Sequence, residues 1–538
     1  MAIERIRTVF KNMSFTPDVP SAALSDNEYN IGQNVETDVR SIKKVDGDEL
    51  ILQNIAGNVI YVTSNFRIGT TYWFVVATDE GEWYGLNGTG SPTVLTPNVA
   101  QYTGNTYSVS TAITDSWNGD VLFLNDGINP PMYLLPNQQE IRLYDSSYID
   151  QTPNTYVWNY YANTPGWEDL TAGFMRVYSS PNVGSLLIAG NLQYSLGGTT
   201  YTLPNTVRWS QAFGLNSGPT TWAPTLTNVA NEVDVPVRGP LIDGFPLGGN
   251  FYVCSYWDTV VFSPIAYTTT SAPVFGIRLL NQGRGLLNEN CWANTDNLVF
   301  GIDARDVWMF DGGQFTPIGN QRVKNYLHDN INADYYNLVF MINNSEKYQI
   351  EIYYPDLNST GFCNQMISYR YDLNIWNPPR QVTNAVEATE SPIWTANVPD
   401  LSTRGVVYAR GNAAGQQALI QKDQGTSFIN GEPINAFFRR DNINYGEAYS
   451  YNVQVHRVLP QVVGTGNIQV AVGGAQSTGQ APTFKPTVTM NIDTDYPWVQ
   501  IDQNDSRVVS LIVSSNTATT TWQITEADWQ ISVIEDDR

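Results

Sequence analysis

The chain has 538 residues, of which 42% are hydrophobic, 12% aromatic and only 15% charged, and its 28 Lys and Arg against 51 Asp and Glu give a formal net charge of −23. Globular chains average about 25% charged residues, so this chain is poor in charge and poorest in basic side chains. The abundance of apolar side chains excludes intrinsic disorder. The shortage of Lys and Arg argues against a surface that grips a nucleic-acid backbone or an anionic membrane.

Targeting signals and disulfides are not expected. No run approaches the roughly 20 apolar residues of a membrane-spanning helix, and the opening MAIERIRTVFKNMSF lacks the apolar stretch of a secretion signal. We therefore expect that the protein does not insert into a membrane and that it is assembled in a cytoplasm. Cys254, Cys291 and Cys363 are widely spaced and form no CxxC motif, which predicts buried free thiols.

Residues 1–44 are predicted to form a docking arm with no fold of its own. The segment is rich in Pro, Asn and Asp and lacks long periodicity, and Pro17 and Pro20 favour extended backbone. Apolar Phe15, Val19 and Leu24 would hold such an arm along a neighbouring surface.

Residues 45–428 have the texture of an all-β domain. Short Val, Ile, Tyr, Phe and Trp runs alternate with Gly, Asn and Asp turns, and four stretches predict hairpins: 73–86, 120–134, 250–262 and 297–313. Their spacing is near that of a propeller blade of about 40 to 50 residues. We predict a β-propeller with an insertion at about 135–180 and one short helix at 322–332. A pair of β-sandwiches is the alternative.

Residues 429–538 change character again. Strand-like segments of roughly even spacing, among them YNVQVHRVLPQVV, NIQVAVGG and RVVSLIVSS, predict a separate antiparallel β-sandwich.

Motifs that carry chemistry are scarce. His328 and His456 lie far apart and outside any nucleophile motif, and phosphate loops are absent. The paired acids in NIDTD (491–495) and DARD (303–306) are typical of solvated turns, with a calcium-stapled turn as the alternative. We therefore expect no enzyme activity, no cofactor and no metal site.

A glycosidase is the enzymatic alternative to this expectation. Glycoside hydrolysis needs two carboxylates across a cleft. The strand-end acids Asp126, Asp258 and Asp303 are candidates, although nothing local separates them from turn residues.

Acidic residues concentrate early in the chain. Residues 45–200 contain 3 basic and 14 acidic side chains. One interpretation is solubility, because net charge far from zero keeps particles apart. The other interpretation is that this stretch forms a surface that repels a polyanion moving past it.

Four segments of the sequence are distinctive when taken together. They are FTPDVPSAALSDNEYNIGQNVETDVRSIKKVDGDELIL (15–52), VRWSQAFGLNSGPTTWAPT (207–225), the stretch 280–332 and MISYRYDLNIWN (366–377). All four resemble segments of the tail nozzle (tail tubular, or stabilisation) proteins of short-tailed bacteriophages. The second is similar to the "RWS…W.P" block of that family, here Arg208, Trp209, Ser210, Trp222 and Pro224. The third resembles the core of the family's propellers, and the fourth resembles the strand pair that follows.

This resemblance implies a structural protein of the virion tail. It implies a six-bladed propeller and a homohexameric ring below the portal and adaptor proteins, which conducts and retains genomic DNA without specific binding and anchors tail fibres or tailspikes. The acidic residues that would line its channel are Asp79, Glu80, Glu82, Asp115, Asp120 and Asp126. The alternative function is a polysaccharide-binding or polysaccharide-cleaving propeller, acting as a tail depolymerase or receptor-binding head.

Overall fold

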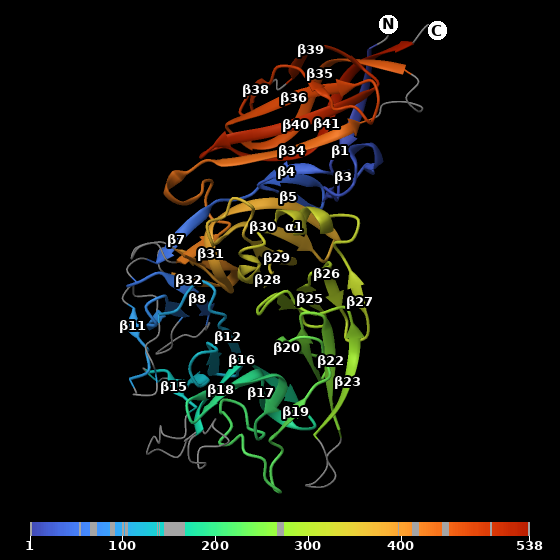
Figure 1. Cartoon of the computed structure of the whole chain (residues 1–538). Coiled ribbons are helices and arrows are strands. Elements are labelled where there is room, and N and C mark those ends of the chain that lie inside the picture. Colours follow the sequence, from blue (N-terminus) through green and yellow to red (C-terminus); the bar gives the residue numbers. More distant parts are fainter. Residues whose placement is uncertain are drawn as a thin grey trace.

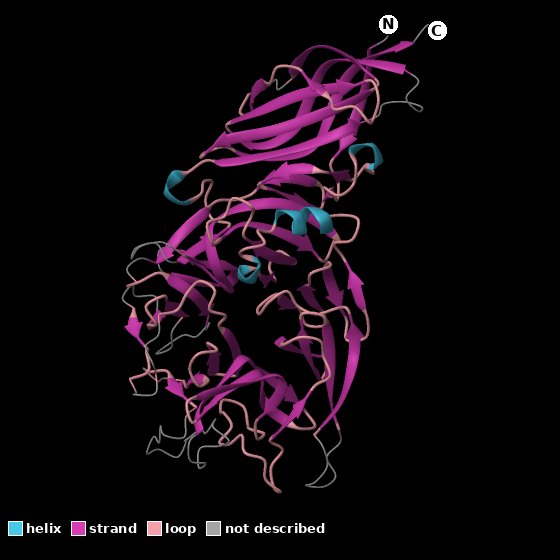
Figure 2. Ribbon diagram, viewed as in Figure 1, coloured by secondary structure: helices cyan, strands magenta, loops and turns pink. Residues whose placement is uncertain are grey.

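The computed structural model describes residues 3–52, 55–64, 73–86, 92–98, 102, 106–136, 138, 140–144, 167–265, 274–395, 398–411, 419–443, 451–494 and 498–535. These residues are mostly β structure, which confirms the all-β class. Helical segments are α1 (Lys324–Asn330) and the single 3-10 turns η1 (Ser21–Ala23), η2 (Tyr336–Leu338) and η3 (Ile429–Gly431). The helix predicted at 322–332 is therefore confirmed. The strands form two stacked modules, and both termini lie at the far end of the upper one (Figures 1 and 2).

The lower module consists of antiparallel sheets that follow one another in chain order (Figure 1). The first three contain β8 (Val59–Ser64), β9 (Phe74–Thr78), β10 (Trp83–Leu86) and β11 (Thr93–Val94); β12 (Thr114–Asn118), β13 (Val121–Asn125), β14 (Met132–Leu134) and β15 (Arg142–Leu143); and β16 (Trp167–Ser180), β17 (Gly184–Leu196), β18 (Thr199–Trp209) and β19 (Asn231–Asp234). The next two contain β20 (Leu241–Leu247), β21 (Asn250–Ser255), β22 (Asp258–Pro264) and β23 (Phe275–Gln282); and β24 (Trp292–Asn294), β25 (Val299–Ile302), β26 (Val307–Phe310) and β27 (Phe315–Pro317).

The last sheet of the lower module has seven strands and joins the two ends of the module. It contains β28 (Phe340–Asn344), β29 (Gln349–Tyr354), β30 (Cys363–Arg370), β31 (Ile375–Thr395), β32 (Val398–Arg410), β33 (Leu419–Lys422) and β7 (Asp48–Leu52). The edge strand β7 comes from the N-terminal part of the chain and pairs with β33, with Asp48 opposite Lys422. A strand from before the first sheet therefore completes the last one.

The four predicted hairpins are confirmed as β9–β10, β13–β14, β21–β22 and β25–β26. Their strands bury nearly every side chain, and in β13 all five residues are buried. The predicted insertion at about 135–180 needs correction at both ends. Arg142–Leu143 forms β15, which pairs with β14 in the second sheet. Trp167–Ser180 forms β16, the first strand of the third sheet, because it pairs along its length with β17. Residues 145–166 lie outside the described residues.

The upper module has two sheets that share one hydrophobic core. One contains β1 (Ile3–Val9), β5 (Val35–Asp38), β6 (Ser41–Lys44), β35 (Tyr451–Thr465), β39 (Val499–Ser506) and β41 (Thr521–Glu535). The other contains β4 (Ile31–Gln33), β34 (Ile434–Ile443), β36 (Asn467–Ala475), β37 (Thr483–Phe484), β38 (Val488–Asn491) and β40 (Val508–Thr517). A parallel pair, β2 (Ser14–Phe15) and β3 (Glu28–Tyr29), lies in the sequence between β1 and β4.

The structure corrects the prediction of an arm with no fold of its own over residues 1–44. Strand β1 pairs with β41 from Ile3 opposite Ser532 to Val9 opposite Glu526. Strands β5 and β6 extend the same sheet, and β4 extends the other by pairing with β34. The segment is folded because several of its apolar residues, including Phe15, are buried in the core of its own chain, whereas Val19 and Leu24 are only half-buried. The predicted boundary at residue 429 therefore does not isolate the upper module.

Asn34 is the point where the chain passes from one upper sheet to the other, between β4 and β5. Its φ is +53° and its side chain is fully buried. Asn tolerates this left-handed conformation better than most residues. Its amide nitrogen donates to the Asn435 carbonyl at 2.8 Å and its amide oxygen accepts from the Gln381 backbone N–H at 2.8 Å. One side chain thus connects the N-terminal segment to both modules.

Candidate functional site

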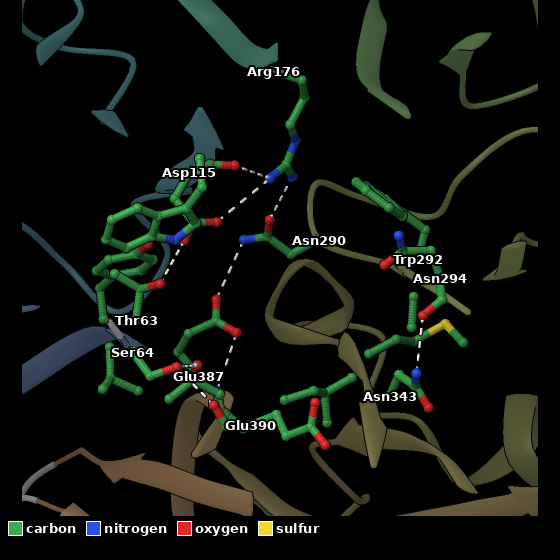
Figure 3. Close-up of a pocket in the computed structure, with 18 of the residues that line it drawn as sticks. Thr63, Ser64, Asp115, Arg176, Asn290, Trp292, Asn294, Asn343, Glu387 and Glu390 are labelled. Atoms are coloured by element: carbon green, nitrogen blue, oxygen red, sulfur yellow. Dashed lines mark hydrogen bonds and ion pairs between the residues drawn. The ribbon is translucent and has the colours of Figure 1, made fainter. Parts of the chain in front are cut away.

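The first strands of the lower sheets surround a cavity of about 620 Å³. Figure 3 shows polar side chains pointing into it from several sheets. The lining residues come from β8, β12, β16, β24, β28 and β31; among them are Tyr61, Thr63, Ser64, Asp115, Trp117, Asp120, Arg176, Asn290, Trp292, Asn343, Glu387 and Glu390. Because five of the lower sheets contribute lining residues, residues far apart in sequence meet around this cavity.

Arg176 of β16 and Asp243 of β20 form a buried ion pair beside the cavity. The Arg176 Nε and Nη2 atoms donate to the two Asp243 carboxylate oxygens at 3.0 and 2.5 Å. Nη1 donates to the Asp115 carbonyl at 2.7 Å, and the guanidinium lies 5.2 Å from the centre of the Trp292 ring. The Trp292 indole N–H also donates to Asp243. This geometry fixes β12, β16, β20 and β24 relative to one another, because bidentate pairs are directional.

Asn290 continues this network across the cavity towards β31 (Figure 3). Its amide oxygen accepts from Arg176 at 2.8 Å, and its amide nitrogen donates to the Ile113 carbonyl at 2.9 Å and to Glu387 at 3.3 Å. The network therefore reaches from Arg176 on one side of the axis to Glu387 on the other.

Glu390 lies further along β31, where the cavity meets a second hollow of about 710 Å³. Asn294, Asn343 and Glu390 line both spaces. Glu390 accepts a hydrogen bond from Ser345 and pairs with Arg404 at 3.7 Å. Glu390 therefore lies at the boundary between the two spaces.

Two carboxyl groups near the network, those of Glu387 and Glu289, have raised pKa values. Burial raises the pKa of Glu387 from 4.5 to about 8, and the Asp115 carboxylate adds to this increase. Burial likewise raises the pKa of Glu289 to about 7, with a smaller contribution from Asp243. At neutral pH Glu387 is therefore mostly protonated in the free protein. Such perturbed carboxyls in a cavity mark candidate functional sites.

Replacing Glu387 with Gln should stabilise the protein at high pH. The unfolded carboxyl ionises near pH 4.5 and the folded one near 8, so ionisation favours unfolding and stability is lost as pH rises between these values. Glu387→Gln should match the parent at pH 5 and exceed it at pH 8 by about 1–3 kcal/mol, a figure reduced for solvent in the cavity. Thermal denaturation of both proteins between pH 5 and 8 measures this difference in stability. A difference that does not change with pH would contradict the prediction. Glu80→Gln is the control, because Glu80 is exposed.

The predicted channel-lining acids separate into two groups. Asp115 and Asp120 line the cavity, whereas Asp79, Glu80, Glu82 and Asp126 are not among its lining residues. Asp79 accepts from the backbone and side chain of Asn58 at 2.8 and 2.7 Å, which fixes the β9–β10 turn. Glu82 accepts from Thr96. Whether any of these six residues faces a DNA channel stays a prediction.

The strand-end acids considered for glycosidase chemistry act in turns. Asp126 accepts the Ile128 and Asn129 backbone N–H groups at 2.9 and 2.7 Å. Asp303 similarly accepts those of Arg305 and Asp306, at 2.7 and 2.9 Å.

The remaining candidates have structural contacts of their own. Asp258 pairs with Arg238 at 2.5 Å. His328 contacts the Lys324 and Asp303 carbonyls, and His456 contacts Ser532. The three cysteines are free and buried, which confirms that prediction. Within the described residues, no three His, Cys, Asp or Glu side chains are grouped to hold a metal ion.

Sequence reasoning missed Arg176, Asn290 and Glu387. One signal was available for Arg176, since it is one of only 3 basic residues in the acidic stretch 45–200. Nothing local in the sequence distinguishes Asn290 or Glu387, which meet only because their strands converge.

Comparisons with known proteins add little. No family model matches the chain. No curated protein matches it. A solved structure described as "Structure of U3-55K" is similar with a TM-score of 0.41 and 7% sequence identity, over 70% of this chain and 98% of that one. No helix in the described ranges is long and apolar enough to cross a membrane.

Proposed function

We propose that this protein is a structural component of a short-tailed phage virion, the tail nozzle, which forms a hexameric ring below the portal and adaptor. In this proposal it conducts and retains the DNA genome, anchors tail fibres or tailspikes, and has no enzyme activity. It assembles in the host cytoplasm and remains in the virion tail.

The observation that carries the proposal is the convergence of three segments that resemble nozzle proteins. Asp18 of the opening segment accepts the Asn325 and Tyr326 backbone N–H groups of α1 at 2.7 and 2.8 Å. Asn377 accepts the Thr37 backbone N–H at 2.9 Å, and Arg370 donates to the Thr37 carbonyl at 3.2 Å. The resemblance in 15–52, 280–332 and 366–377 therefore falls on residues that form one junction.

We further infer a finer architecture, a β-propeller joined to a β-sandwich. The seven-stranded sheet is divided by the long strand β31, whose first part pairs with β30 and whose later part pairs with β32. Glu387 to Glu390 in that later part line the cavity as a first strand does elsewhere. This division supports seven blades, in place of the six that the family resemblance implied.

Assembly into rings is supported by the exposed edge strand β1. Among the described strands β1 pairs with β41 alone, and its Ile3 and Val9 side chains are 64% and 51% exposed. An exposed edge strand presents unpaired backbone groups that can pair with another chain.

Electron microscopy of the purified protein, alone and with its adaptor, tests the main proposal. The expected result is ring particles with sixfold symmetry, together with a matching mass by sedimentation. A protein that stays a monomer at high concentration even with the adaptor present would refute it.

A polysaccharide-cleaving propeller is the second candidate, and the cavity is the observation in its favour. Asp115 and Glu387 line the same space, and the raised pKa of Glu387 suits a general acid. Release of reducing sugar from host polysaccharide, abolished by Glu387→Gln in a folded protein, would support this candidate over the first.

A further inference from the structure

A separate cavity of about 310 Å³, which we call the junction cavity, lies where the two modules meet. Its lining residues come from the N-terminal segment and β34 on one side and from α1, β29, β30 and β31 on the other. It shares no lining residue with the cavity that contains Arg176 or with the hollow next to that cavity. Its size is at the lower end of the range of pockets that bind small molecules.

Aromatic rings form much of the lining of the junction cavity. Phe15, Tyr326, Tyr354 and Phe437 contribute these rings from four separate segments. The Phe15 and Tyr326 rings pack edge to face, with their centroids 5.5 Å apart and their planes at 88°. Phe15 belongs to the shared hydrophobic core, so its ring is held in place. A ligand with apolar C–H groups would therefore meet a preformed aromatic surface.

The Tyr354 hydroxyl is a buried polar group without a protein partner. Tyr354 is the last residue of β29 and is only 1% exposed, and its hydroxyl makes no hydrogen bond with any described residue. The oxygen keeps a small accessible surface, and Tyr354 lines the junction cavity. Burying a hydroxyl without a partner costs stability, so its retention here indicates a bound molecule that pairs with it.

Two further groups at the cavity have unoccupied hydrogen-bonding positions. The Tyr326 hydroxyl also makes no hydrogen bond with the described residues. Asp356 Oδ1 accepts the Asn358 backbone N–H at 2.8 Å and the Asn364 side-chain amide at 2.7 Å, whereas Oδ2 has no partner in the described part of the chain. One oxygen therefore holds the carboxylate in place, and the other is available to a ligand.

We propose that the junction cavity binds a neutral sugar, one or two rings of a saccharide, whose hydroxyl groups pair with Tyr326, Tyr354 and Asp356 and whose C–H groups pack on the aromatic rings. A sugar supplies donors, acceptors and apolar C–H groups in one molecule. An ammonium or guanidinium ion would supply donors alone and leave both phenol protons unpaired. An anion would be repelled by Asp356, and a hydrocarbon would leave all three polar groups unpaired. This binding is additional to the structural role proposed above and does not depend on it.

Saturation-transfer NMR and calorimetric titration of the full chain test this proposal, with D-glucose, D-galactose, L-rhamnose, N-acetyl-D-glucosamine and maltose as probes. We expect saturable binding of at least one of these sugars, with a dissociation constant on the order of 1 mM. Asp356→Asn should weaken binding about tenfold, because it removes a charged acceptor. Tyr354→Phe should weaken binding about threefold without lowering the melting temperature, since the hydroxyl bonds to nothing in the free protein.

Matched controls separate this site from other surfaces. Tyr348→Phe and Asp334→Asn alter exposed residues that do not line the junction cavity, and both variants should bind as the parent does. Failure of all the sugars to bind saturably would overturn the proposal, as would equal binding by the parent, Tyr354→Phe and Asp356→Asn. Binding of choline or methylguanidine that is lost in Asp356→Asn, with no sugar bound, would overturn it as well. Sugar binding that is lost in Glu387→Gln and kept in Tyr354→Phe would assign the sugar to the other cavity and have the same consequence.

Discussion

Deleting residues 1–44 is expected to unfold the upper module. The deletion removes β1, β4, β5 and β6 from two sheets and takes six large side chains out of the shared core, namely Phe10, Met13, Phe15, Tyr29, Val35 and Ile42. Each buried side chain of this size contributes about 1.5–3 kcal/mol. The combined loss is on the order of 10 kcal/mol, comparable to the whole net stability of a typical domain.

Hydrogen exchange and limited proteolysis measure this effect directly. In the truncated chain, amides of β34, β35, β40 and β41 should lose protection, and cleavage should begin after residue 428. Deletion of residues 1–9 is the matched control, because β1 is largely exposed and Phe10 remains. That shorter deletion should lower the melting temperature by only a few degrees. A truncated chain lacking 1–44 that keeps full protection would restore the original view of the segment as a docking arm.

Arg380→Met is expected to destabilise the protein by about 3–5 kcal/mol, because it leaves the buried Asp48 carboxylate without its ion-pair partner. Arg380 donates to Asp48 at 2.6 Å, pairs with Asp423, and donates to the Asp46 carbonyl at 3.0 Å. Its side chain is 3% exposed and that of Asp48 is fully buried. The pair links β31 to β7, so its loss also weakens the closure of the last lower sheet.

The pH dependence of this loss gives a second, independent measurement. In the variant the unpaired Asp48 carboxyl should have a folded pKa above its unfolded value, so the destabilisation should shrink as pH falls towards 5. Urea unfolding at pH 5 and pH 8 compares the two conditions. Arg7→Met is the control, because Arg7 is 59% exposed and its pair with Asp528 is worth at most about 1 kcal/mol. A loss of similar size in both variants would show that the buried pair contributes no more than a surface one.

A wider network surrounds Arg380 and explains why the junction is sensitive to charge. Lys347 pairs with Glu36 and Asp423 at 3.1 and 3.0 Å, and Lys422 pairs with Glu351 at 2.7 Å. Burial alone would raise the pKa of Glu36, but Lys347 and Lys43 lower it to about 2. The N-terminal strands are thereby connected to the lower module by ion pairs as well as by apolar contacts.

The strands themselves could be predicted from the sequence because their signal is local. Alternating or continuous apolar runs bounded by Asp, Asn and Gly turns located the four hairpins, and helical spacing located α1. Free buried cysteines followed from their number and spacing. The segment 1–44 was misjudged because β4 and β5 are short and rich in polar residues. They become strands only through pairing, β4 with β34, and β5 with β6, which in turn pairs with β41.

The sequence by itself determined the all-β class, the hairpins, the low basic content and the lack of local catalytic motifs. Only the tertiary structure decided the role of the N-terminal segment and the composition of the cavity. Arg176, Asp243, Asn290 and Glu387 lie on four different strands or their approaches, separated by up to 211 positions from first to last. The physical reason is that side-chain periodicity records which face of a strand is buried, whereas the convergence of distant first strands on one axis depends on sheet order, which no local pattern encodes.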